Sequence, residues 1–335
     1  MDKRRILFHR AFPPEAFKAG TSGGQQKVRD VFEYASQSTD FEPKVYFPVD
    51  TVWHDNPGNV WLPYRKEALK NWDPRPGDIL FLAGKDWGQI QPDPTLRSDI
   101  PILAIAQPRH VRPEDPRHDF LQHRAIRIAK SRAGQEILQN HGVNGPVFLI
   151  PDAIDFSHLP APTAVPETDL FIVGLKNPGN ARELKARLED HFGDALRIEI
   201  QDAKLPTRED FLAMLNRCRI ACFFTVPPER GLEGFYLPAL EAMVLEKLVV
   251  CPDAIGNRDF CLADKTCVMP PDHSVDAYFD AVLRAVAMSE AEVREIRSAA
   301  RAQADHHRME SEREAYWELF GLAGEIWRTE SLFRS

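Results

Sequence analysis

Two glutamates in the second half of the chain have a spacing that suits a phosphate-bearing ligand. Glu233 lies in a loop after an apolar segment, and Glu241 follows Pro238, a residue that suits the first turn of a helix. We expect this helix to run to about Glu246, with Glu241 on its early, exposed face. Both carboxylates can then converge beside a helix N-terminus, whose amides favour an anion. The alternative is a surface helix whose acids only complement its own dipole.

A glycine-rich loop near the start of the chain is a second candidate anion site. Gly20, Gly23 and Gly24 precede a helix that we expect to begin near Gln25. Glycines let a ligand approach the backbone closely, and the free amides of a first helical turn can bind an oxyanion. The loop fits neither a Walker loop nor the GxGxxG pattern, so a flexible loop and an anion site both stay open. We keep Gly23 and Gly24 as candidate ligand-binding residues.

His110 lies just past an expected strand and is flanked by Arg109 and Arg112. Its imidazole could hydrogen-bond a substrate, and the arginines could bind a phosphate or an acidic acceptor. A solvated surface loop is the alternative. Four tryptophans gather in the first 90 residues, where their faces could stack on a sugar or a lipid or could pack in the core: Trp53, Trp61, Trp72 and Trp87.

Short apolar runs alternate with helical patterns, which indicates parallel sheets with helical crossovers. A proline-rich stretch at 156–168 indicates a linker, and the pattern is helical from Ser289 onward. We therefore expect two Rossmann-like, doubly wound α/β domains that face each other across a cleft, residues 1–160 and 161–311. A strongly apolar helix at about 312–335 is expected to pack back on the first domain.

The composition favours a soluble globular protein, because no apolar run approaches the ~18 to 20 residues that span a bilayer. The basic opening MDKRRILFHRAF is interpreted as a first strand and not as a signal peptide. Residues 1–160 hold 21 basic and 20 acidic side chains and the rest hold 21 and 30, which argues against a nucleic-acid partner. The slightly basic first half leaves a peripheral contact with a membrane open. Five cysteines without a CxxC pair favour reduced thiols and a cytoplasmic location, the inner face of the membrane included.

Residues 233–260, EGFYLPALEAMVLEKLVVCPDAIGNRDF, resemble the donor-site signature of retaining glycosyltransferases of family 4, group 1 glycosyl transferases with the GT-B fold. The resemblance implies that Glu233 holds the hydroxyls of the transferred sugar and that Glu241 accepts hydrogen bonds from the ribose. It also implies that the backbone amides of Gly234, Phe235 and Tyr236 face the diphosphate or the sugar.

Two further segments resemble the same family: residues 125–159 its domain junction, and residues 169–188 the first strand and helix of its C-terminal domain. In that helix region the family binds phosphate with cations, so the resemblance makes Lys176 the best candidate cation, with Arg230 or Arg258 as substitutes. A loop like that of His110 faces the sugar in the family, which implies a catalytic role for His110.

The resemblance implies a hexosyltransferase-type enzyme that moves a sugar from a UDP- or GDP-sugar to a hydroxyl of a sugar, glycolipid or polysaccharide, in the synthesis of cell-surface polysaccharide or glycolipid. The first domain would bind this acceptor and the second the nucleotide sugar. The resemblance also implies no cofactor and no required metal, and the absence of an Asp-x-Asp triplet beside a strand end agrees with this. One alternative is another GT-B enzyme, such as a sugar-nucleotide epimerase or an inverting transferase. A second is a non-catalytic scaffold that binds nucleotide sugar without turnover.

Overall fold

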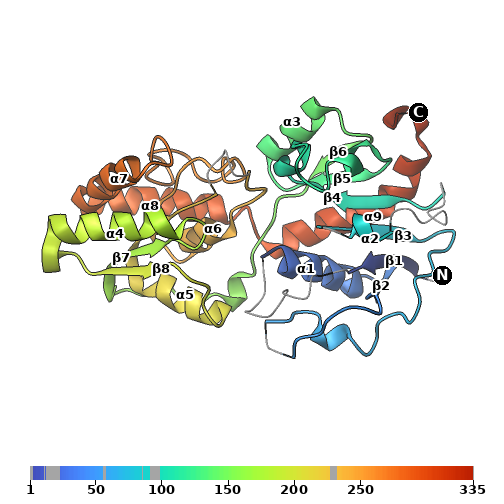
Figure 1. Ribbon diagram of the computed structural model, residues 1–335, viewed down its shortest axis with the longest axis horizontal. Coiled ribbons are helices and arrows are strands. Elements are labelled where there is room, and N and C mark those ends of the chain that lie inside the picture. The colour runs from blue at the N-terminus through green and yellow to red at the C-terminus, as the bar shows by residue number, and fades with distance from the viewer. Residues whose placement is uncertain are drawn as a thin grey trace. The chain divides into compact units, whose positions relative to one another are not determined.

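The computed structural model describes residues 3–10, 12, 23–55, 58–84, 86–90, 99–226 and 232–334. The chain forms two compact units: unit 1 is Met1–Pro151 with Glu312–Ser335, and unit 2 is Asp152–Ser311 (Figure 1). The division falls before the proline-rich stretch, whereas the sequence placed it at residue 160. This stretch belongs to unit 2 because the Asn216 side chain accepts from the Thr163 amide and donates to the Ala161 carbonyl.

Unit 1 is built on a parallel sheet with the strand order β2-β1-β3-β4-β5-β6. Its strands are β1 (Arg4–His9), β2 (Phe41–Tyr46), β3 (Ile79–Leu82), β4 (Ile102–Ile105), β5 (Ile126–Ala129) and β6 (Val147–Leu149). The inner strands β3 and β4 are short apolar runs buried on both faces, as parallel sheets require, and β5 is equally buried but contains Arg127. The strand order reverses between β1 and β3, and ligands of doubly wound sheets bind beyond the carboxyl ends at such a reversal.

The helices of unit 1 are α1 (Gly23–Gln37), α2 (Trp87–Ile90), α3 (Arg132–His141) and α9 (Met309–Arg328). Helix α1 begins at Gly23, so Gly23 and Gly24 form its first turn instead of preceding it. Helix α9 carries the expected apolar face, in which Tyr316, Phe320 and Trp327 are buried.

A buried ionic cluster ties α9 to the rest of unit 1. The carboxylate of Glu312 accepts hydrogen bonds from Lys27 Nζ at 2.6 Å, Lys130 Nζ at 3.3 Å and the Tyr34 hydroxyl at 2.9 Å. Lys130 also donates to the Tyr316 hydroxyl at 2.8 Å. The side chain of Glu312 is 1% exposed, and Asp30 Oδ2 lies 3.3 Å from Lys27 Nζ, so two carboxylates balance two lysines out of contact with water. One residue of α9 therefore joins α1 to the end of β5.

Unit 2 is built on a parallel sheet with the order β10-β9-β7-β8. Its strands are β7 (Thr168–Val173), β8 (Ile198–Gln201), β9 (Cys218–Phe223) and β10 (Leu248–Val250). Its helices are α4 (Pro178–Phe192), α5 (Arg208–Arg217), α6 (Leu237–Val244), α7 (Val275–Ala287) and α8 (Glu290–Ala304). Ser289 caps α8, as the helical pattern indicates, but α7 precedes it and was not expected.

The alternation of side chains along β7 divides the core of unit 2 into two layers. Leu170 and Ile172 pack with α4 and α7, whereas Phe171 and Val173 pack with α5 and α6. Figure 1 shows α4 and α5 on opposite sides of β7 and β8. Both faces of this sheet are therefore covered, which leaves its carboxyl edge as the place where polar groups can meet a ligand.

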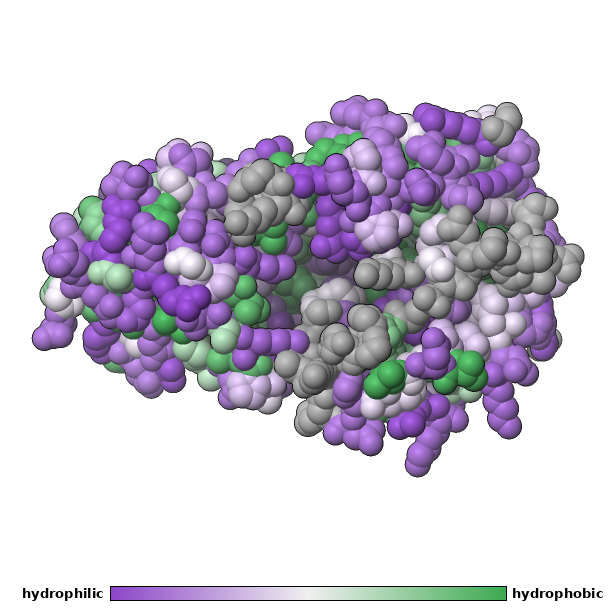
Figure 2. Space-filling view, in the orientation of Figure 1, coloured by the Kyte–Doolittle hydropathy of each residue, from purple (hydrophilic) through white to green (hydrophobic). Residues whose placement is uncertain are grey.

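The surface carries few large apolar side chains. Among the described residues, the exposed ones are Val49, Val52, Val165, Leu175, Leu322 and Leu332. Figure 2 shows a face that is mostly hydrophilic, with apolar residues in small separate groups. Within the described ranges, every helix is too short or too polar to cross a lipid bilayer.

Replacing Glu312 by Gln tests the ionic cluster. The variant removes the carboxylate that Lys27 and Lys130 share in the interior, so we expect unit 1 to lose about 3 to 5 kcal/mol of stability. All six tryptophans lie in unit 1, and their fluorescence during urea unfolding reports on this unit alone. The control is Glu314→Gln, an exposed acid on the same helix that should cost less than about 0.5 kcal/mol. Equal effects of the two substitutions would contradict the role of the cluster.

Candidate functional site

Two of the candidate residues come together at the carboxyl edge of the unit 2 sheet. Lys176 lies in the turn between β7 and α4, and its Nζ is 3.4 Å from Glu233 Oε1. The Lys176 side chain is 46% exposed and that of Glu233 is 13% exposed. Gly174 allows the turn to pack closely, because a Cβ there would lie 2.2 Å from the Cβ of Ala181. The site thus presents a partly exposed cation beside a largely buried carboxylate.

The backbone at Glu233 is held by the loop that follows β10. Glu233 and Ile255 form a parallel bridge, and a Cβ on Gly256 would lie 2.5 Å from the carbonyl carbon of Gly234. Ile255 has a φ of 66°, a value that a β-branched residue rarely adopts. Its amide donates to Asp253 Oδ1 at 2.9 Å, which helps to hold this conformation. Strained backbone of this kind concentrates at functional sites.

Glu241 is fully buried, so the expectation of an exposed position was wrong. Helix α6 is short and apolar on nearly every side, and every residue from Ala239 to Val244 is buried between the sheet and α8. Arg208 Nη2 donates to Glu241 Oε1, while Oε2 has no hydrogen-bond partner among the described residues. Burial raises the pKa of Glu241, and the charge of Arg208 opposes this rise.

Arg208 is a residue of this site that the sequence analysis missed. It is the first residue of α5, behind the N-cap Thr207, and its side chain is 45% exposed. A basic residue at a helix N-terminus is unfavourable for the helix dipole, and this is the signal that could have marked it. Its long separation from Glu241 in the sequence hid the pairing.

The side chains of Phe235 and Tyr236 belong to the core. The Tyr236 ring lies 5.9 Å from that of Phe223, and the Phe235 ring lies 5.1 Å from that of Phe260. Tyr236 is the N-cap of α6, but its side chain does not cap the helix. These side chains are therefore engaged in packing, and the groups that the sequence analysis assigned to a ligand are the backbone amides of these residues and of Gly234.

Other buried polar atoms lie at the carboxyl ends of β8 and β9, the two strands that flank β7. Gln201 ends β8 and Thr225 follows β9, and both side chains have an oxygen without a hydrogen-bond partner in the described part of the chain. Buried polar groups are normally satisfied, so each unmet oxygen at this edge of the sheet calls for a polar partner. The sequence signal for both residues is a polar side chain at the end of an apolar strand, and the sequence analysis did not use it.

The remaining cation candidates have different outcomes. Arg230 lies outside the described residues, as does Gly20. Arg258 is half-exposed and its Nη2 lies 2.6 Å from Asp253 Oδ2, within the loop that holds Glu233. Across the described ranges, no three side chains of His, Cys, Asp or Glu are grouped so that they could hold a metal ion.

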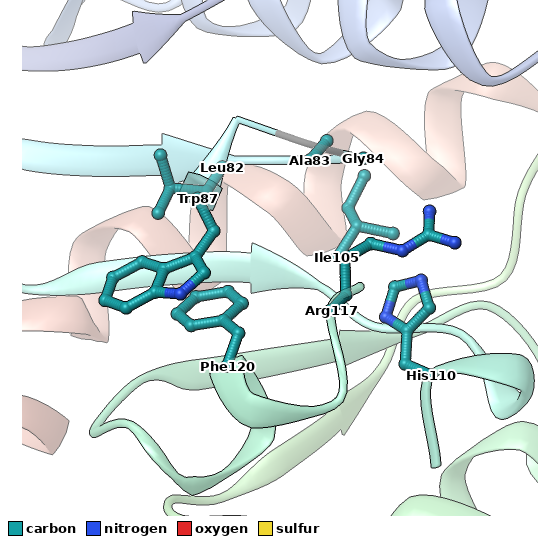
Figure 3. Close-up of a pocket in the computed structure, with 8 residues that line it drawn as sticks. All are labelled: Leu82, Ala83, Gly84, Trp87, Ile105, His110, Arg117 and Phe120. Carbon is teal, nitrogen blue, oxygen red and sulfur yellow. The ribbon is translucent and has the colours of Figure 1, made fainter. Parts of the chain in front are cut away.

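His110 lies in unit 1, at the edge of a small pocket at the carboxyl ends of β3 and β4 (Figure 3). It belongs to a 3-10 turn, Pro108–Val111, and is 4% exposed. Its Nδ1 accepts from the Gln107 amide at 3.3 Å. Burial and the charge of Arg117 lower the pKa of His110 to about 3, against the opposing effect of Asp115. The ring is therefore neutral with its proton on Nε2, a hydrogen-bond donor without a partner among the described residues.

Gly23 and Gly24 lie in unit 1, in the exposed first turn of α1. A Cβ on Gly24 would meet no described atom within 4 Å, so close packing does not require a glycine there. The candidate residues are thus divided between the units: Gly23, Gly24 and His110 in unit 1, and Lys176 with Glu233 to Glu241 in unit 2.

Replacing Arg208 by Gln should destabilise unit 2 by about 1 to 3 kcal/mol, because it leaves a buried carboxylate less satisfied. Burial raises the folded-state pKa of Glu241 above its ordinary 4.5, so stability is lost as the pH rises through the folded value. Without Arg208 this pKa rises further, and the loss at high pH is larger. Calorimetry should therefore show a wider gap from the wild type at about pH 8 than at about pH 5.

The control for this experiment is Arg217→Gln on the same helix. Arg217 pairs with Glu199, and both side chains are partly exposed, so we expect a cost below about 1 kcal/mol that hardly changes with pH. A gap for Arg208→Gln that stays constant with pH would contradict the coupling to Glu241.

Replacing Gly256 by Ala should destabilise unit 2 by about 1 to 3 kcal/mol, because the new Cβ overlaps the backbone of Gly234. Gly179→Ala in α4 is the matched control, since its Cβ would meet nothing within 4 Å. Calorimetry should show lower stability for the first variant and unchanged or slightly higher stability for the second. A fully stable Gly256→Ala protein would refute the close contact.

No family model and no curated protein sequence matches the chain. Its structure is similar to sucrose-phosphate synthase from Thermosynechococcus elongatus, with a TM-score of 0.70, 14% identity and coverage of 95% of this chain and 98% of that chain. It is similar to HepE from Anabaena, with a TM-score of 0.70, 13% identity and coverage of 95% and 99%. A glycosyltransferase from Rickettsia africae matches with a TM-score of 0.63, 12% identity and coverage of 98% and 100%. With two parallel-sheet α/β units, this likeness confirms the expected fold: the chain has a GT-B architecture of two Rossmann-like domains.

Proposed function

We propose that this protein is a nucleotide-sugar-dependent glycosyltransferase of the retaining type, similar to family 4. The observation that carries the proposal is the arrangement at the carboxyl edge of the unit 2 sheet. Lys176 and Glu233 lie within 3.4 Å of each other, and Glu241 offers a buried carboxylate oxygen without a hydrogen-bond partner among the described residues. A nucleotide sugar carries a diphosphate between two hydroxyl-rich rings, so it needs both a cation and carboxylate acceptors.

Each residue then has a role that its chemistry allows. Glu241 accepts hydrogen bonds from the ribose hydroxyls through Oε2, while Arg208 keeps its other oxygen engaged. Lys176 and the amides at Gly234, Phe235 and Tyr236 stabilise the diphosphate as it leaves, and such electrostatic stabilisation usually contributes more to catalysis than any other single effect. Arg230, Gly23 and Gly24 remain proposed contacts to the same ligand.

Glu233 is the proposed catalytic residue that orients the transferred sugar. Its carboxylate is largely buried, and the bridge to Ile255 fixes its backbone, so it can hold hydroxyl groups in one geometry. When the ligand binds, Lys176 exchanges part of its contact with Glu233 for the diphosphate. His110 is the second proposed catalytic residue, since its Nε2–H is available to an oxygen of the substrate.

Similar structures support the choice of nucleotide. HepE was solved in complex with UDP and glucose, and also with UDP-glucose. We therefore propose a UDP-sugar, with a GDP-sugar as the next candidate, and a hydroxyl of a sugar, glycolipid or polysaccharide as the acceptor. Unit 1 binds the acceptor in this proposal, and the reaction requires no metal. The role that fits is polysaccharide or glycolipid synthesis in the cytoplasm or at the inner membrane face.

A thermal-shift titration with UDP, GDP and ADP and their glucose conjugates tests the nucleotide site. A ligand that binds only the native state stabilises it by about 2.7 kcal/mol at one hundred times its Kd. We expect one nucleotide series to stabilise the protein, and Glu241→Gln to weaken its binding about tenfold or more, because the variant weakens charged hydrogen bonds to the ribose. Glu183→Gln, an exposed acid on α4, is the control and should bind as the wild type does.

The type of reaction needs a separate measurement. Glu233→Gln should keep nucleotide binding and lose transfer, and the anomeric proton signal of the product should show retained configuration. Turnover without an acceptor would favour an epimerase, and inverted configuration an inverting transferase. Binding without any turnover would favour a scaffold, and no nucleotide binding would refute the proposed function.

A further inference from the structure

The ion pair between Arg208 and Glu241 uses only one oxygen of the carboxylate. Arg208 Nη2 donates to Glu241 Oε1, and Oε2 has no hydrogen-bond partner among the described residues. On the same helix, Arg217 binds both oxygens of Glu199: its Nη2 donates to Oε1 at 2.9 Å and its Nε to Oε2 at 3.1 Å. This two-pronged geometry is a frequent form of an arginine–carboxylate pair. The pair at Glu241 therefore leaves one acceptor open at a position where burial makes an unmet oxygen costly.

Arg208 is the exposed member of its pair. Its side chain is 45% exposed, whereas that of Glu241 is 0% exposed. The two oxygens of a carboxylate share one carbon atom, so a ligand group bound to Oε2 lies within a few ångströms of the guanidinium on Oε1. A guanidinium carries more N–H donors than a single carboxylate oxygen can accept. Arg208 is thus placed to donate a hydrogen bond to the same ligand that Glu241 binds.

A second unmet acceptor lies on the same face of the sheet. Gln201, the last residue of β8, is in register with Val173 of β7, and residues in register in a parallel sheet point to one face. Val173 packs in the layer of α5 and α6, so Gln201 lies on the face that carries Arg208 and Glu241. Its Oε1 is buried and has no hydrogen-bond partner in the described part of the chain. A ligand that extends from Glu241 along this face therefore has a further acceptor to bind.

We propose that Arg208 is a specificity-determining residue that recognises the vicinal diol of the donor's ribose together with Glu241. Glu241 Oε2 accepts the proton of one hydroxyl, and the guanidinium of Arg208 donates to the oxygen of the neighbouring hydroxyl. A vicinal diol offers two such groups on adjacent carbons, and the ion pair offers an acceptor and a donor side by side.

This inference rests on the proposed function, in which Glu241 binds the ribose, and it narrows the substrate class. The donor is a sugar carried by a ribonucleoside diphosphate. Donors built on a deoxyribonucleoside are rejected, because the missing hydroxyl leaves a polar group of the pair without its partner.

Titration calorimetry of the full-length protein with UDP, 2′-deoxy-UDP and 3′-deoxy-UDP tests this division of the diol. Loss of either hydroxyl should weaken binding to the wild type about tenfold or more, since one hydrogen bond to a charged group is lost. Glu241→Gln should remove most of the penalty for one missing hydroxyl, and Arg208→Gln most of the penalty for the other. Each penalty is a ratio of affinities measured on one protein, so a general loss of stability in a variant does not change it.

Arg217→Gln is the matched control, because its partly exposed pair with Glu199 lies on the same helix, and it should keep the wild-type affinity for every nucleotide. The role of Arg208 is overturned if Arg208→Gln keeps both penalties, or if it removes the same penalty as Glu241→Gln, since the arginine then acts only through Glu241. Tighter binding of UDP to Arg208→Gln would also overturn it, because Arg208 would then compete with the ligand.

The same titrations separate this inference from the proposed function. If the wild type binds UDP and both deoxy analogues equally well, the nucleotide site stands and the recognition of the diol is refuted. If the wild type binds no nucleotide, the proposed function itself is refuted and the inference is refuted with it.

Discussion

The close approach of Gly256 to the backbone of Glu233 and Gly234 is the contact on which the site of unit 2 depends. It holds Glu233 and Gly234 beside the loop that follows β10, and the bridge between Glu233 and Ile255 completes the alignment. The left-handed conformation of Ile255 is the cost of this geometry. Because the loop is fixed there, the Glu233 carboxylate faces Lys176, and the chain enters α6 at the angle that buries Glu241.

Burial also decides the electrostatics of both units. Lys27 and Lys130 share the carboxylate of Glu312 and Lys27 also pairs with Asp30, so their charge is neutralised inside unit 1. Arg127 is equally buried and has only carbonyl acceptors among the described residues. In unit 2 the buried charge is negative. Arg208, which is partly exposed, donates a hydrogen bond to Oε1 of Glu241, and Oε2 has no hydrogen-bond partner among the described residues. Buried charge that is neutralised internally supports the fold, whereas buried charge left incomplete marks where a ligand of opposite polarity can bind.

Local pattern accounts for most of the fold. Apolar runs such as 79–82 and 102–105 form strands because a parallel sheet buries them on both faces. Ser289 begins α8 because its hydroxyl caps the helix, a signal contained within four residues. Helix α7 was missed although Ser274 caps it and Val275, Tyr278 and Val282 recur at helical spacing, a local signal that was not used.

By itself, the sequence determined the alternation of strands and helices in two α/β units. It also located four candidate residues after strands, where parallel sheets expose their carboxyl edge: Lys176, Glu233, Glu241 and His110. Only the tertiary structure decided that Lys176 meets Glu233, that Arg208 pairs with a buried Glu241, and that Trp87 and His110 share one pocket. The physical reason is the distance along the sequence over which each effect acts. Propensity and capping act over a few residues, whereas burial and pairing join side chains from strands and helices that are distant in the sequence.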